Sequence, residues 1–152
     1  MEYLTNHDLI FINHAVTGLV NRYDYFALEA CMAGQYKYGD SNDTPGQAAT
    51  FLERMITRMP FAEGNKRTAF IALLTFLNAN GYATLLTEEK AAALITSVVE
   101  GHVTPRDAID ALASPAREAM TAIPLRKLMM FECNHHSEAL KLLAVKDGEL
   151  VQ

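Results

Sequence analysis

The sequence predicts an all-α protein: a compact helical bundle around one central buried helix. Half of the 152 residues are apolar and a fifth are charged, which is the balance of a globular domain with a substantial core. Ala, Leu, Met and Glu are plentiful, whereas Val and Ile never cluster in alternating runs, so helix is favoured over strand. The central helix is predicted at residues 65–80, where apolar residues occupy almost every side.

The first two helices are predicted from capping residues and apolar spacing. Thr5 and Asp8 form a capping pair, and apolar residues follow at helical spacing as far as Val20. A second helix is expected over residues 24–32, and it ends at Gly34.

A loop separates the second helix from the third. Residues 36–46 are rich in Gly, Asp, Ser, Asn and Pro and are therefore predicted to form a loop. Helix resumes near Gln47 and ends before Pro60, because proline disfavours the helical conformation of the residue that precedes it. One apolar stripe runs along this third helix and contains Ala48, Leu52, Met55, Ile56 and Met59.

The remaining helices of the bundle follow from similar signals. Gly81 is a natural left-handed stop after the central helix. Thr87 starts the next helix, which has two carboxylates in its first turn and ends near Gly101. Thr104 caps a further helix, with a proline at its first position.

The chain is expected to consist of a helical domain, residues 1–113, and a C-terminal extension, residues 114–152. The extension is expected to pack on the domain or to contact a partner. Within it, residues 119–130 predict a helix with a break at Pro124, and residues 137–145 form a short amphipathic stretch.

Charge and composition exclude several classes of function. The net charge is −5 without a long basic run, whereas sequence-independent nucleic-acid binding needs clustered Lys and Arg. The amino terminus predicts no secretory signal, and the longest apolar stretch, residues 69–77, is too short to span a bilayer. The only two cysteines, Cys31 and Cys133, suit a reducing compartment. These features predict a cytoplasmic protein that binds neither nucleic acid nor membrane.

The residues that carry chemistry lie in the segment 59–70, MPFAEGNKRTAF. A loop of turn-forming residues runs straight into the central helix, and peptide N–H groups at a helix start form a ready site for an anion. Gly64 lets the backbone approach a phosphate closely, and Lys66 and Arg67 add cationic donors. Glu63 is an oxygen ligand placed where Mg²⁺ could bridge it to nucleotide phosphates. The segment therefore predicts a phosphate cradle with one metal ligand.

This segment resembles the signature of the Fic family, His-Pro-Phe-x-Asp/Glu-Gly-Asn-Gly-Arg-x-x-Arg. The matching positions are Pro60, Phe61, Glu63, Gly64, Asn65 and Arg67. Lys66 replaces the second glycine and is followed by Arg-Thr-Ala, which looks like the death-on-curing (Doc) branch of the family. The likeness extends over about residues 3–112 and does not cover the C-terminal extension.

The resemblance implies a Fic/Doc-like bundle that transfers a phosphoryl or adenylyl group from a nucleotide to a protein hydroxyl. It implies ATP or another nucleotide as the cofactor, with Mg²⁺ at Glu63. The residues that it assigns to phosphate or nucleotide binding are Phe61, Gly64, Asn65, Lys66 and Arg67. Arg67 is also assigned to catalysis. The implied partners are an antitoxin and a protein target, which is a translation factor in the Doc branch.

Two positions depart from the family pattern. Met59 occupies the place of the family's histidine, which acts as general base on the target hydroxyl. A thioether cannot take up a proton, so the standard route is blocked. Met59 is interpreted as a continuation of the apolar stripe, with a specialised role in a changed site as the alternative. Phe70 replaces the closing arginine of adenylyl-transferring members, a loss shared with the Doc branch. None of the five histidines is an obvious substitute.

Three functions remain open on these grounds. The sequence favours a degenerate Fic/Doc protein that keeps its phosphate-binding loop, is catalytically impaired and belongs to a toxin–antitoxin system. The first alternative is an active transferase with a different base, because phosphoryl transfer depends largely on positioning and charge stabilisation. The second alternative is a non-enzymatic interaction module.

Overall fold

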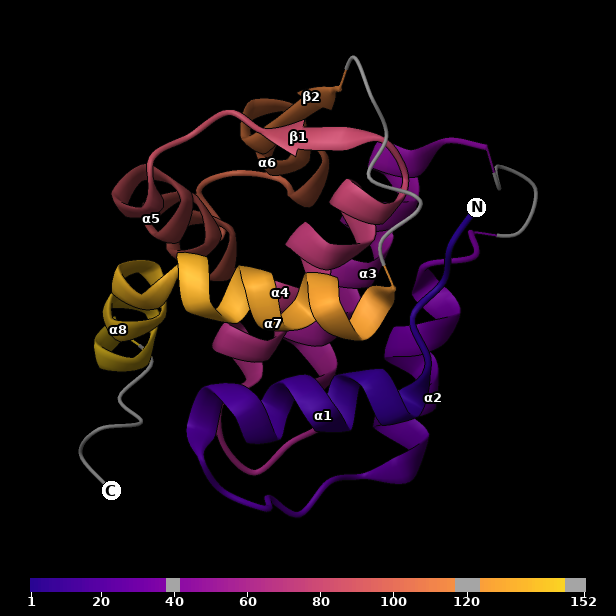
Figure 1. Ribbon diagram of the computed structural model, residues 1–152, viewed down its shortest axis with the longest axis vertical. Coiled ribbons are helices and arrows are strands. Elements are labelled where there is room, and N and C mark those ends of the chain that lie inside the picture. The colour runs from indigo at the N-terminus through magenta and orange to yellow at the C-terminus, as the bar shows by residue number, and fades with distance from the viewer. Residues whose placement is uncertain (38–41, 117–123, 147–152) are drawn as a thin grey trace.

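The computed structural model describes residues 1–37, 42–116 and 124–146 of the chain. Within these residues, eight helices form a bundle, and a short two-stranded sheet lies at the top of Figure 1. The predicted all-α bundle is confirmed, with this small sheet as an addition. No described helix combines the length and the apolar character needed to cross a membrane.

Three helices precede the central one. They are α1 (Asn6–Thr17), α2 (Tyr25–Gly34) and α3 (Thr44–Arg58). The predicted capping box of Thr5 and Asp8 starts α1. Gly18, at φ 71°, ends this helix before the predicted Val20, because a left-handed residue cannot continue a right-handed helix.

Helix α3 starts earlier than the sequence predicts. The loop expected over residues 36–46 ends at Asp43, whose side chain accepts a hydrogen bond from the N–H of Gly46 at 3.2 Å. Pro45 does not delay the helix, because proline is tolerated in the first turn, where its missing N–H has no intrahelical partner to lose. Turn-forming residues therefore cap and open a helix here instead of extending the loop.

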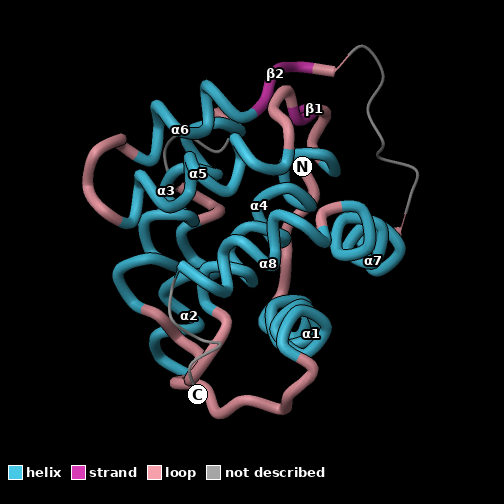
Figure 2. The backbone as a smooth tube through the Cα atoms, turned by 90° about the vertical axis from the view of Figure 1, so that its left-hand side faces the viewer, coloured by secondary structure: helices cyan, strands magenta, loops and turns pink. Residues whose placement is uncertain are grey.

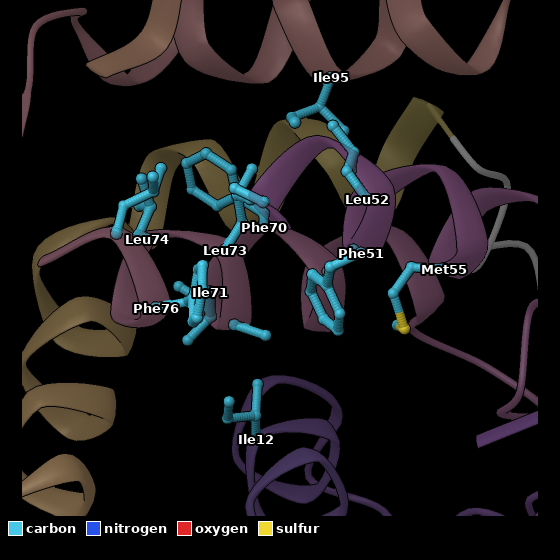
Figure 3. Close-up of a cluster of buried hydrophobic side chains, with 14 of the residues drawn as sticks. Ile12, Phe51, Leu52, Met55, Phe70, Ile71, Leu73, Leu74, Phe76 and Ile95 are labelled. Carbon is cyan, nitrogen blue, oxygen red and sulfur yellow. The ribbon is translucent and has the colours of Figure 1, made fainter. Parts of the chain in front are cut away.

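The central helix α4 (Asn65–Ala79) carries the core, as predicted (Figure 3). Its large buried side chains are Phe70, Ile71, Leu73, Leu74, Phe76 and Leu77. Ile12 of α1 lies on one side of this cluster and Ile95 of a later helix on the other. A helix that is buried on every side fixes the position of its own amino-terminal end, where the predicted phosphate-binding loop joins it.

Four short elements follow α4. They are β1 (Tyr82–Thr84), α5 (Glu88–Val99), α6 (Pro105–Leu112) and β2 (Ala113–Pro115). Thr87 and Thr104 cap the two helices as predicted. The strands pair in antiparallel fashion, with Tyr82 opposite Pro115. Three residues are too few to display a strand periodicity, so the sequence does not predict this pairing.

The predicted C-terminal extension, residues 114–152, begins within β2, and its described helices are α7 (Leu125–His135) and α8 (Ser137–Lys146). Helix α7 begins directly after Pro124, where the sequence places a break, and the predicted helical residues 119–123 lie outside the described residues. Helix α7 packs against α4 and α1, and α8 packs against α5 and α4 (Figure 2). These two helices therefore cover the side of α4 that α3 leaves open.

Candidate functional site

The candidate site lies where the loop after α3 enters α4. Gly64 is the residue before the helix, at φ 80°, and no described side chain caps the amino-terminal end of α4. Most other helices here start with a capping Thr or Asp side chain, and these caps satisfy first-turn N–H groups. The predicted local structure, a loop that runs directly into the buried helix, is confirmed.

Asn65 holds this loop closed through its side chain. Its Nδ2 donates to the carbonyl of Phe61 at 2.8 Å, and its Oδ1 accepts from the N–H of Phe61 at 2.9 Å. The sequence predicted Asn65 as a phosphate ligand. In the structure its side chain binds the loop backbone and fixes the shape of the loop, which leaves its peptide N–H as the group that the prediction concerns.

Phe61 anchors the same loop in the core. Its side chain is only 4% exposed and lies near the Tyr23 ring, with 6.3 Å between ring centroids. The neighbouring backbone is tied to the α1–α2 connection: Asp24 donates to the Pro60 carbonyl at 2.8 Å, and Ala62 to the Arg22 carbonyl at 2.9 Å. A buried Phe61 side chain cannot contact a nucleotide directly, contrary to the role that the family resemblance implies.

Gly64 and Arg67 both face α1. A Cβ atom at Gly64 would lie 2.4 Å from Cγ2 of Thr17, so only glycine fits between the loop and α1. Nη1 of Arg67 donates to the carbonyl of Val16 at 2.9 Å, near the carboxyl end of α1. Arg67 therefore joins the start of α4 to the end of α1, and part of its donor capacity serves this contact.

A pocket of about 280 Å³ opens beside the start of α4. Its walls come from the end of α3, the start of α4 and one side of α5, and they are formed by Met55, Ile56, Met59, Asn65, Lys66, Ala69, Ile95 and Val99. Most of these side chains are apolar, and Lys66 is the charged one among them. The pocket therefore offers one cation and a helix start within an apolar enclosure.

Met59 lies at the edge of this pocket and not in the core. It follows the last residue of α3, adopts φ 42° and ψ 68°, and is 62% exposed. The interpretation of Met59 as part of the buried stripe is therefore wrong. The positive φ ends the helical path, so Met59 leaves the stripe that Leu52 and Met55 continue to occupy.

The backbone and the side chain of Glu63 have different surroundings. Its carbonyl accepts a hydrogen bond from the side chain of Asn13 at 2.8 Å, whereas its own side chain is partly exposed. Among the residues that the structure describes, no group of three His, Cys, Asp or Glu side chains is arranged to hold a metal ion. Glu63 is thus a single carboxylate beside the helix start.

All five histidines lie in the described residues, and none of them lines this pocket. Nδ1 of His14 is 3.0 Å from the carbonyl of Leu19, and His102 lies beside Glu100 on the surface. His136 is buried against Glu132 at the α7–α8 junction. The structure therefore brings no histidine to the place that Met59 occupies.

Sequence reasoning missed a group of polar side chains on α1 and in the following loop. Asn13, Thr17 and Asn21 are linked by hydrogen bonds, and the amides of Asn13 and Asn21 also donate to the Glu63 carbonyl. Asn13 is only 2% exposed although it stands among the apolar residues of α1. An asparagine in an apolar stripe was the available signal, because a buried amide requires hydrogen-bond partners.

One comparison with known proteins matches the part of the chain that contains this site. Residues 7–77 match the model of the Fic/DOC family, just under half of the chain. No curated protein and no solved structure matched the chain. The matched residues include nearly all of α1, the loop that enters α4, and most of α4 itself. Over residues 7–77 the chain is therefore similar to the Fic/DOC family.

Proposed function

We propose that this chain binds the phosphates of a nucleotide at the start of α4 and is a degenerate Fic/DOC protein with impaired catalysis. The observation that carries the proposal is the pocket beside that helix start. Lys66 lines it, no described side chain caps the helix there, and Met59 stands at its edge in place of a titratable residue.

The pocket offers two kinds of contact to a nucleotide. The first-turn peptide groups of α4 and the ammonium group of Lys66 favour a phosphate, because both present positive charge at one place. The apolar walls, which include Ile56 and Ile95, suit the flat face of a base. A nucleotide uses both features, whereas inorganic phosphate uses only the first.

Glu63 is the carboxylate that this proposal assigns to Mg²⁺. Protein-bound Mg²⁺ is commonly held by one or two carboxylates together with phosphate oxygens of the substrate. Glu63 immediately precedes the Gly64 cap of α4 and has a partly exposed side chain, so it fits the role of a single protein ligand. Such a site needs the nucleotide to complete it, and we expect Mg²⁺ alone to bind weakly.

Impaired catalysis follows from the side chain at position 59. A general base needs a group that can take up a proton near neutral pH, and the Met59 thioether cannot. Histidine is one of the residues enriched at positive φ, so Met59→His would introduce a basic nitrogen at the pocket edge without new backbone strain. We propose that this single change restores part of the family's transfer chemistry.

Calorimetry with ATP and Mg²⁺ tests the binding half of the proposal. Wild-type protein should release or absorb heat with saturation, and Lys66→Ala should weaken the affinity. Lys127→Ala, at an exposed position on α7 outside the pocket, is the control and should bind as wild type does. Absence of both heat and thermal stabilisation by ATP would favour the non-enzymatic interaction module.

Labelled nucleotide incubated with cell lysate tests the catalytic half. Wild-type protein should label no protein, and Met59→His should label at least one. Met59→Gly is the matched control, because it relieves the positive φ without adding a base, and it should label nothing. Labelling by wild-type protein that disappears in Lys66→Ala would establish instead the active transferase with a different base.

The biological setting is proposed from the family alone. We propose that the chain acts together with an antitoxin and that its protein target is a translation factor. Co-purification of the tagged chain with the product of a neighbouring gene is the direct test. A chain that co-purifies with no such product, in cells that express both, argues against the toxin–antitoxin setting.

A further inference from the structure

The pocket beside the start of α4 offers few polar side chains to the base of a bound nucleotide. Eight described residues line it, and only Asn65 and Lys66 among them are polar. The other six have apolar side chains; they are Met55, Ile56, Met59, Ala69, Ile95 and Val99. A base in this pocket therefore meets mainly hydrocarbon and thioether groups.

Neither polar side chain is suited to recognising a particular base. Both ends of the Asn65 amide bind the backbone of Phe61, with Nδ2 donating at 2.8 Å and Oδ1 accepting at 2.9 Å. Lys66 carries the charge that the proposed function assigns to the phosphates, and an ammonium group has no acceptor to offer to the amino group of a base. Thus no side chain of the described lining matches the donor and acceptor pattern of one base.

Peptide groups do not replace these missing side-chain contacts. The apolar walls are formed by the sides of α3, α4 and α5. Peptide dipoles lie roughly parallel to a helix axis, and their N–H and C=O groups bond within the helix, so the side of a helix presents side chains to a ligand. The walls therefore contact a base by apolar packing.

Apolar packing distinguishes poorly between the two purines. Adenine and guanine share the same fused rings, but adenine carries an amino donor where guanine carries a carbonyl acceptor. A site that hydrogen-bonds such a group rejects a ligand without it by about 10⁴–10⁵-fold, whereas an apolar pocket discriminates weakly between ligands of one shape. Met55 and Met59 add to this tolerance, because methionine side chains are unbranched and adapt to ligands of different shape.

We propose that this pocket accepts both purine nucleoside triphosphates and selects its ligand by the phosphates and not by the identity of the base. The base packs against the apolar walls, and Lys66 binds the phosphates at the other end of the ligand. This inference rests on the proposed nucleotide binding and names the class of nucleotide that the site takes.

Calorimetry of wild-type protein with Mg·ATP, Mg·GTP and magnesium tripolyphosphate is the first test. The dissociation constants of the two nucleotides should agree within tenfold, because the walls contact both purines in the same way. Tripolyphosphate has the phosphates without the base, so we expect it to bind at least tenfold more weakly than either nucleotide.

Three variants separate the contact with the base from the contact with the phosphates. Ile56→Ala shortens an apolar wall and should weaken both nucleotides by a similar factor, about tenfold, with tripolyphosphate changed less than twofold. Lys66→Ala should weaken all three ligands. Leu85→Ala, at a 59% exposed position outside the pocket, is the control and should bind as wild type does. If Ile56→Ala does not fold, Val99→Ala at the 39% exposed end of α5 carries the test, with an expected loss of about threefold.

The outcomes distinguish this inference from the function on which it rests. Wild-type protein that binds neither nucleotide refutes the proposed function and this inference with it. Wild-type protein that prefers one purine nucleotide by more than tenfold supports nucleotide binding and overturns the inference, because a group in the site then recognises the base. Tripolyphosphate that binds as tightly as the nucleotides also overturns it, because the base would then make no contact with the apolar walls.

Discussion

The side chain of Asn65 binds the backbone of Phe61 twice, through its Nδ2 to the carbonyl at 2.8 Å and through its Oδ1 from the N–H at 2.9 Å. This paired contact closes the five-residue segment from the buried Phe61 ring to the first residue of α4. The first residue of α4 thus fixes the shape of the loop before any ligand binds, which reduces the conformational entropy lost on binding.

Asn65→Ala should destabilise the protein and loosen the loop. We expect the free energy of unfolding to fall by about 1–3 kcal/mol, because two hydrogen bonds are lost and the Phe61 N–H is left without this acceptor. Asn65→Asp keeps the acceptor and loses only the donor, so its loss should be smaller. Urea unfolding of wild type and both variants measures the order of their stabilities. An Asn65→Ala variant as stable as wild type would show that the paired hydrogen bonds between Asn65 and Phe61 do not stabilise the loop.

Gly64→Ala should cost more than Gly101→Ala, although both glycines have φ 80°. The shared cost is the left-handed conformation, about 1–2 kcal/mol for a residue with a Cβ. At Gly64 the new Cβ would also lie 2.4 Å from Cγ2 of Thr17, whereas nothing lies within 4 Å at Gly101. We expect an additional loss of about 1–3 kcal/mol at Gly64 from this overlap.

A second substitution identifies the origin of that additional loss. Thr17→Ser removes the clashing Cγ2 and keeps the hydroxyl, so it should recover part of the stability of Gly64→Ala. Thermal unfolding of both single variants and the double variant gives the coupling between the two positions. Additive effects, with no recovery in the double variant, would show that the overlap with Thr17 is not the cause.

Local signals predicted most of the fold, because caps and helical spacing act over a few residues. Thr5, Thr87 and Thr104 cap the helices that the sequence assigns to them, and residues 65–80 form the buried helix almost to the residue. The candidate site follows from the same local pattern, since a loop that runs into a helix start is encoded within one short segment.

The features that sequence reasoning missed depend on contacts between distant segments. Asn13 is 50 residues from Glu63 in the chain, so no local pattern indicates that its amide holds the Glu63 carbonyl. The pairing of β1 with β2 is also between distant residues. Met59 was misplaced for a different reason: a period of three and four residues assigns it to the apolar stripe, but its positive φ turns it out of the helix.

The two cysteines should react slowly with alkylating reagents at neutral pH. Burial raises the pKa of Cys31 to about 11, and burial together with the charge of Glu132 raises the pKa of Cys133 to about 11. Because the thiolate is the reactive form, the rate for Cys133 at pH 8 should be about 100-fold below that of the unfolded chain and should rise about tenfold per pH unit.

Mass spectrometry after timed iodoacetamide treatment measures these rates for each cysteine. Cys31, which is completely buried, should react more slowly still than Cys133, because the reagent must wait for the core to open. Protein denatured in urea is the control and should react at both positions at similar rates. Reaction of Cys133 at the denatured rate at pH 8 would mean that α7 does not shield it.

Glu132 and His136 should contribute much of the free energy that holds α7 and α8 against the bundle. Glu132 is 2% exposed, pairs with Nε2 of His136 at 2.9 Å and accepts a hydrogen bond from the side chain of Asn78 on α4. Nδ1 of His136 faces Glu88 of α5 at 3.5 Å, and its ring meets Phe70 edge-on. One polar cluster therefore links both terminal helices to α4 and α5.

Glu132→Ala should lower the free energy of unfolding by about 1–3 kcal/mol, because the buried His136 ring and the Asn78 amide lose the carboxylate that is their common partner. Glu132→Gln keeps the shape and can still accept from Asn78, so its loss should be smaller. Glu138→Ala is the control. The Glu138–Lys141 pair lies on the exposed face of α8, so this substitution should leave the stability unchanged.

Urea unfolding of the double variant Glu132→Ala/His136→Ala tests whether the two residues stabilise the bundle through their mutual contact. Since His136 loses its main partner in Glu132→Ala, the double variant should be no less stable than that single variant, and fully additive losses would mean that the two residues stabilise the bundle independently.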